Sequence, residues 1–219
     1  AIATDISQAL SCVLAVGYLL RVKSDYKINI KELKIDKAIA KEIIRIGLPT
    51  AIQNAVISFS NVLVQSSVNA YGSTAMAGYT AYLKIDGFNI LPVLSISMAV
   101  TTFTGQNVGA KNLKRVKKGM YDALIMCTIY TVLTGAFLLS LSHQILSLFT
   151  NDSAVIEYGQ LAMKYFCPFY FLLGILNTLA GTVRGAGKGV PPMLILLFSM
   201  CIFRIFWIKL ALPFFSTID

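Results

Sequence analysis

The sequence predicts an all-α fold, a bundle of helices that crosses a membrane several times. Of its 219 residues, 56% are hydrophobic and only 13% are charged, whereas soluble domains carry about 25% charged residues. Apolar stretches of about 20 residues recur along the chain, which is the length that spans a bilayer as a helix. The cations gather in alternate loops between these stretches, as they do in polytopic membrane proteins.

Six stretches are long and apolar enough to be spanning helices. They are expected to be α-helical throughout, because lipid offers no hydrogen-bond partner to an open backbone. The six stretches are 1–20, 46–70, 79–104, 119–141, 158–182 and 190–213.

Lysine and arginine predict the direction of these helices. Three alternate loops hold eight, five and two cations: 21–45, 105–118 and 183–189. The loops between them hold none. Short cytoplasmic loops are enriched in cations, so we expect these three loops to face the cytoplasm. Their position argues against nucleic acid as the partner of the net charge of +9. We expect these cations mainly to set the topology, with attraction to membrane lipids as a secondary effect.

The charged connector 21–45 separates the first helix from the next five. Its second half has the apolar spacing of an amphipathic helix that lies on the membrane surface and leads into the second span. So long a link predicts a boundary between two lobes, although an ordinary cytoplasmic loop is the alternative. Pro49 is expected in the first turn of the second span, where its missing N–H costs little.

The second span carries a polar stripe. Asn54, Ser58, Asn61 and Gln65 follow one another at intervals of three or four residues, which places them on one helical face. Polar groups are expensive against lipid, so this face is expected to line a wet cavity. Hydrogen bonding to a neighbouring helix is the alternative.

The third span carries two charges, Lys84 and Asp86, two residues apart and therefore on different faces. Asn89 shares a face with Asp86. Asp86 is expected roughly 10 Å below the outer end, and Arg204 of the sixth span reaches a similar depth. We therefore expect Asp86 to be neutralised by Arg204 or Lys84. Intramembrane charges are candidates for function, with a purely structural ion pair as the alternative. Pro92 is expected to kink this helix.

The fifth span also carries a stripe, formed by Tyr170, Gly174, Asn177, Gly181 and Arg184. Glycines on such a stripe allow two helices to approach closely. Asn177 adds a polar group near the middle of the membrane.

No residue pattern indicates an enzyme or a metal site. The chain has one histidine, and its four cysteines are not at ligand spacing. The RGAGKG turn at 184–189 lacks the first glycine and the Ser or Thr of a phosphate-binding loop. We expect neither catalytic residues, nor metal ligands, nor a bound cofactor.

Five segments are similar, in the same order, to helices of one transporter family. The opening AIATDISQ resembles the start of that family's sixth helix, and IGLPTAIQ resembles its seventh. KIDGFNILP, followed by TGQNVGAKNLKRVKKG, resembles the eighth helix and its cytoplasmic end. GTVRGAGKGVPPM and FRIFWIKLAL resemble the tenth and eleventh. On these motifs, which cover nearly the whole chain, the sequence resembles the multidrug and toxic compound extrusion (MATE) family.

The resemblance implies half of a twelve-helix, two-lobe transporter. Residues 1–20 would be the last helix of the amino-terminal lobe, 21–45 the cytoplasmic linker, and 46–219 five of the six helices of the carboxy-terminal lobe. The chain lacks a starting Met and opens inside an apolar run, which fits a piece of a longer protein.

The resemblance also implies an activity, carried out in the plasma membrane by rocking of the two lobes. It is export of small organic, often cationic, drugs or toxins in exchange for sodium or protons, by a protein expected to be monomeric. Some relatives carry carboxylates midway along the seventh and tenth helices, at positions that fall near Ile57 and Leu173 here. Both are apolar, so coupling is expected to depend on Asp86 or on the other lobe.

Two other functions are compatible with the sequence. One is a flippase of the same superfamily that moves lipid-linked oligosaccharide or polysaccharide precursors, whose cavity would be more cationic. The other is a non-transporting membrane scaffold, in which the stripe of Asn54, Ser58, Asn61 and Gln65 would be packed dry against neighbouring helices.

Overall fold

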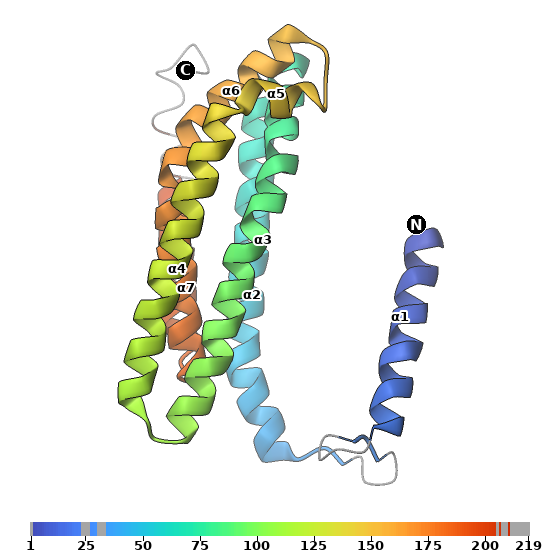
Figure 1. The fold of residues 1–219 in the computed structure, drawn as a ribbon, viewed down its shortest axis with the longest axis vertical. Coiled ribbons are helices and arrows are strands. Elements are labelled where there is room, and N and C mark those ends of the chain that lie inside the picture. Colours follow the sequence, from blue (N-terminus) through green and yellow to red (C-terminus); the bar gives the residue numbers. More distant parts are fainter. Residues whose placement is uncertain (1, 23–26, 30–33, 205, 207–209, 211–219) are drawn as a thin grey trace. The chain divides into compact units, whose positions relative to one another are not determined.

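The computed structural model describes residues 2–22, 27–29, 34–204, 206 and 210. Its contacts divide the chain into two compact units, Ala1–Ile43 and Ile44–Asp219. The first unit contains helix α1 (Ile2–Arg21), which has no buried residue. The second contains a helical bundle (Figure 1). The prediction of an all-helical membrane bundle is confirmed.

Four long helical segments form the bundle. They are α3 (Ser73–Gly109), α4 (Leu113–Ser140), α6 (Ser153–Phe166) and α7 (Tyr170–Gly185). α3 packs against α4, α6 and α7, and α4 packs against α7 (Figure 1). The predicted fifth span is α6 and α7 together, joined by the short 3₁₀ turn η2 (Cys167–Phe169), where Pro168 interrupts the α-helical hydrogen bonding.

The two ends of the bundle differ in chemistry. We call the end with the cationic loops the inner end and the opposite end the outer end. At the inner end, the tight turn between α3 and α4 is closed by Asn112, whose side chain accepts a hydrogen bond from the Arg115 N–H. At the outer end, the short helix α5 (Ser142–Ser147) packs on α6. A core that includes the fully buried Leu146 and Met163 lies at this end.

Helix α2 (Lys37–Asn69) corrects one expectation about the connector. The expected surface helix and the second span form one unbroken helix of 33 residues. The Asp36 carboxylate starts it by accepting hydrogen bonds from the N–H groups of Ala38 and Ile39, at 2.8 and 3.3 Å. Pro49 therefore lies inside the helix, and the prediction that it occupies the first turn is wrong. In this position it removes the N–H that would bond to the Arg45 carbonyl.

The predicted sixth span begins as α8 (Val190–Leu196) and continues as the π-helical segment η3 (Leu197–Phe203). Widened turns of this kind leave carbonyl groups free for other partners. One of them, the Met200 carbonyl, accepts a hydrogen bond of 2.8 Å from the Ser60 hydroxyl of α2. Much of the remainder of this predicted span, up to residue 213, lies outside the described residues.

Four helical segments of the described structure are long and apolar enough to cross a membrane: α1, α3, α4 and Ser153–Gly185. α2 has the required length, but its polar residues lower its hydropathy. The apolar helix Val190–Met200 is shorter than a full span.

Candidate functional site

The polar stripe of α2 is accessible in this structure. Asn54, Ser58 and Asn61 are exposed or partly exposed and Gln65 is half-buried. A neighbouring face of the same helix packs inward through Gln53 and Ser60, which are 6% and 1% exposed. The four stripe residues thus share a face that the rest of the unit leaves largely uncovered.

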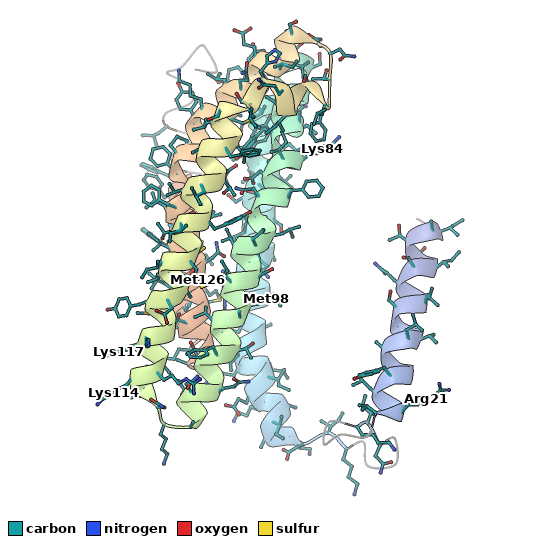
Figure 2. All side chains as sticks on the ribbon, viewed as in Figure 1. Arg21, Lys84, Met98, Lys114, Lys117 and Met126 are labelled. Carbon is teal, nitrogen blue, oxygen red and sulfur yellow. The ribbon has the colours of Figure 1, made fainter. Side chains whose placement is uncertain are left out.

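A cleft of about 840 Å³ lies between α2, α3, α7 and the α8–η3 segment. Most of its lining is apolar, with Ile57, Leu94, Met98, Leu173, Leu176 and Met200 among the residues involved. Met98 marks its position in Figure 2, midway between Lys84 near the outer end and Lys114 at the inner end. We call it the inner cleft.

Polar side chains from three helices reach the inner cleft. Gln53 and Asn54 come from α2, Ser97 from α3, and Asn177 and Arg184 from α7. Arg184 is the one charged residue in the described lining. A largely apolar pocket with a few convergent polar groups is the common form of a small-molecule site.

Close packing of α3 on α7 sets the wall of this cleft. A methyl group added to Gly181 would lie 2.7 Å from the Ser97 carbonyl oxygen, so only glycine permits this approach. The Thr101 hydroxyl donates to the Gly181 carbonyl at 3.0 Å, and the Ser97 hydroxyl donates to the Asn177 carbonyl at 2.7 Å. The Arg184 guanidinium then donates to the Ser97 hydroxyl at 3.3 Å. The expected glycine-mediated approach is confirmed.

Asp86 lies in a different setting, towards the outer end. Its half-buried carboxyl group lies beside the hydroxyls of the buried Tyr82 and Tyr170. The Tyr82 ring stacks on Phe166, with ring centroids 5.2 Å apart. The Tyr170 hydroxyl is fully buried and has no hydrogen bond of normal length, although it faces the carboxyl group. We call Asp86, Tyr82 and Tyr170 the outer cluster.

The expected ion pair of Asp86 does not form among the described residues. Arg204 instead donates to the Ser60 hydroxyl at 3.3 Å and to the Asn61 side-chain oxygen at 3.0 Å. Its charge still acts electrostatically on Tyr79, as does that of Asp86. Arg204 is therefore held by α2 and does not pair with Asp86.

Lys84 points away from Asp86. Its ammonium nitrogen lies 5.9 Å from the centre of the Phe149 ring, a favourable cation–π arrangement. It also lines a separate pocket of about 570 Å³ at the outer end, together with Asp152. Two residues of separation turn Lys84 and Asp86 to different faces of α3, which agrees with the expectation from their spacing.

The two remaining candidate residues make hydrogen bonds within the bundle. Asn89 accepts from the Tyr130 hydroxyl through its backbone and side-chain oxygens, at 3.2 and 3.3 Å, which ties α3 to α4. Asn177 donates its amide to the Leu173 carbonyl at 2.9 Å while lining the inner cleft.

Two residues that the sequence did not single out belong to the inner cleft. Gln53 lies one position before the stripe and is turned inward, and Ser97 connects Arg184 to the backbone of α7. A glutamine within an apolar span was a signal for Gln53. Ser97 lies in an ordinary helical sequence and gave no signal. No group of three or more His, Cys, Asp or Glu in the described part of the chain could hold a metal ion.

The fold and the cleft define the class as a polytopic helical membrane protein with polar and charged side chains inside the bundle. Residues 49–208 match the MatE family model, and the chain belongs to this family of transporters. Its members are multi-pass proteins of the plasma membrane and are not enzymes.

Curated relatives are named as drug-resistance or export proteins. The chain is 31% identical over 160 residues to the probable multidrug resistance protein NorM of Thermotoga maritima, which covers 73% of this chain and 34% of that protein. It is 28% identical over 207 residues to the probable multidrug resistance protein YoeA of Bacillus subtilis, covering 91% and 44%. With the multidrug export protein MepA of Staphylococcus aureus it shares 24% identity, covering 86% and 42%. The chain thus spans less than half the length of each of these relatives.

Solved structures share the fold. A multidrug resistance MATE family transporter of the MOP superfamily, in an outward-facing conformation, superposes with a TM-score of 0.88 at 19% identity, over 98% of this chain and 49% of that one. A MOP superfamily transporter from Pyrococcus furiosus superposes with a TM-score of 0.82 at 21% identity, over 92% and 47%. In that second transporter, the reverse polarity of the binding pocket suggests a different function.

Proposed function

We propose that the whole protein is a secondary active exporter of organic drugs or toxins. The observation that carries this proposal is the accessible stripe of Asn54, Ser58 and Asn61 beside the largely apolar inner cleft. This arrangement suits substrates that have both apolar and polar parts. The names of the curated relatives support it, since they describe multidrug resistance and export.

Three segments of the chain have different roles in this proposed exporter. Residues 46–219 would form five helices of one lobe, residues 1–20 the last helix of the other, and 21–45 the link between them. Substrate would enter a cavity between the lobes, and rocking of one lobe against the other would open it to alternate sides of the membrane.

Coupling to sodium or protons is assigned in this proposal to the outer cluster. The Asp86 carboxyl group has no cationic partner among the described residues, and two tyrosine hydroxyls lie beside it. A carboxylate in this setting can take up a proton or a small cation, which is what an antiporter requires. The exported compounds would be small organic molecules, cationic ones included.

Accumulation of ethidium and norfloxacin tests the proposal in cells that contain or lack the whole protein. Export predicts lower accumulation in the cells that contain the protein. Collapse of the gradient that drives export, either sodium or protons, should abolish this difference, and collapse of the other gradient should not. Equal accumulation of a range of organic dyes in both cell types would refute drug export.

Flipping of lipid-linked oligosaccharide or polysaccharide precursors is the second candidate function. It is favoured by Arg184, a cation that lines the inner cleft with no carboxylate in the described lining. The alternative of a non-transporting scaffold required a stripe packed dry, whereas Asn54 and Asn61 are exposed in this unit.

A further inference from the structure

The inner cleft has hydrogen-bonding capacity that the described structure does not use. Arg184 carries five N–H donors in a planar fork. One of these donors is used, in the 3.3 Å hydrogen bond to the Ser97 hydroxyl. Arg184 is half-buried, so its positive charge is partly removed from water at the wall of the cleft.

Gln53 is the second group without a partner among the described residues. Its side chain is 6% exposed, lines the inner cleft, and has an amide oxygen that is fully buried without a hydrogen bond. This oxygen is an acceptor and is itself buried, so it offers no bond to an anion, whereas the NH2 group of the same amide can donate. Its neighbour Asn54 also lines the cleft and is exposed, so two amides face the same space as Arg184.

No carboxylate of the described lining balances this charge, since that lining contains no Asp or Glu. Asp122, near the inner end of α4, is exposed and outside the lining. Asp86 is 11 positions before Ser97 on α3, or about 16 Å along the helix. The cleft is therefore positive at its polar wall and apolar elsewhere.

We propose that the inner cleft binds an amphiphilic organic anion. Its carboxylate or phosphate head would bond to the Arg184 guanidinium, which matches the planar geometry of such groups. The NH2 groups of the Gln53 and Asn54 amides would donate to the remaining oxygens of the head. The apolar body would lie against Leu94, Met98 and Leu173. This binding uses the same inner cleft on which the proposed export rests, but it is measured without transport, so its failure can be distinguished from a failure of export.

The test uses the whole protein in nanodiscs of phosphatidylcholine, with 11-(dansylamino)undecanoic acid as a fluorescent probe. Its methyl ester is the matched neutral probe. The acid should bind, and Arg184→Gln should weaken its binding by about tenfold or more, because a charge-assisted hydrogen bond is lost. The ester should bind weakly, and its affinity should be the same in the natural protein and in Arg184→Gln. Lys188→Gln is the matched control, since Lys188 is a cation four positions further on, outside the described lining, and should not affect binding.

A second substitution keeps the proposal testable if the Arg184→Gln variant does not fold. Gln53→Met keeps the approximate volume but removes both the buried oxygen without a partner and the NH2 donor of the amide. It should raise the thermal stability of the ligand-free protein and weaken binding of the acid several-fold. The proposal is overturned if the acid and the ester bind equally well to the natural protein. Unchanged binding of the acid in both Arg184→Gln and Gln53→Met would also overturn it.

Competition distinguishes the source of the anion. If phosphatidylglycerol in the nanodisc displaces the acid from the natural protein, and this competition is lost in Arg184→Gln, the site holds a lipid head group. If the acid stays bound in phosphatidylglycerol nanodiscs, the site selects a soluble amphiphile. Both outcomes support an anion site.

Discussion

The outer cluster and the inner cleft carry opposite charges on the same pair of helices. In the outer cluster, Asp86 of α3 lies beside Tyr170 of α7. At the inner cleft, Ser97 of α3 holds Arg184 of α7. Tyr170 and Arg184 are 14 residues apart, about 21 Å along a helix. Neither charge forms an ion pair among the described residues.

The two regions differ in packing, which determines what each can bind. At the outer cluster, the carboxyl group lies beside the hydroxyls of Tyr82 and Tyr170, and the Tyr82 ring stacks on Phe166. At the inner cleft, Gly181 allows α3 and α7 to touch, and a space of about 840 Å³ remains beside them. The difference favours an ion site towards one end and an organic-ligand site towards the other.

Replacement of Gly181 by Ala should have the largest effect on stability, because it would disrupt the packing of α3 on α7 beside the inner cleft. The new methyl group would lie 2.7 Å from a backbone oxygen of α3 and force the two helices apart. We expect a loss of about 1–3 kcal/mol in stability, measured by thermal unfolding of the purified whole protein in detergent. Gly87→Ala is the control, because a methyl group there meets nothing within 4 Å. Equal stability of the two variants would contradict the close-packing argument.

Replacement of Asp86 by Asn tests the outer region. Asparagine keeps the size of the side chain but can neither release a proton nor neutralise a cation. We expect gradient-driven export of ethidium to fall by about tenfold or more while the protein remains folded. Asp122→Asn, at an exposed position near the inner end of α4, should leave export unchanged. If Asp86→Asn exports normally, the carboxyl group has a structural role only.

Alanine substitutions of Ser60 and Ser58 test the packing of two faces of α2, with a smaller expected effect on stability. Ser60 donates to the Met200 carbonyl and accepts from Arg204, so Ser60→Ala should lower stability by about 1 kcal/mol. Ser58 lies on the stripe and is not buried, so Ser58→Ala should leave stability unchanged. Thermal unfolding of the two variants, side by side, measures the difference. Equal losses would mean that the stripe is packed in the whole protein.

Helical spacing predicted much of the candidate site from the sequence. The stripe of Asn54, Ser58 and Asn61 follows from residue spacing, because the helical period alone determines which residues share a face. The close approach at Gly181 was also predicted, since small residues mark helix contacts in membranes. The burial of Gln53 could not be predicted in this way, because it depends on which neighbour covers each face of α2.

The partners of Asp86 and Arg204 could not be predicted from the sequence. Depth along the membrane placed Asp86 and Arg204 at similar levels, but depth says nothing about rotation. In the folded unit, Arg204 faces Ser60 and Asn61 of α2, and Asp86 faces Tyr82 and Tyr170. The start of α2 was also not predicted. The charged residues before Pro49 continue the helix, so Pro49 lies inside it.

The sequence by itself determined the membrane class, the helical composition, the distribution of cations and the polar face of α2. These properties depend on composition and on the period of a single helix. The partners of each charge, the place of the inner cleft, and its shared lining by Gln53 and Arg184 came from the tertiary structure. Those properties depend on the rotation of each helix against its neighbours, and side-chain packing from distant parts of the chain sets that rotation.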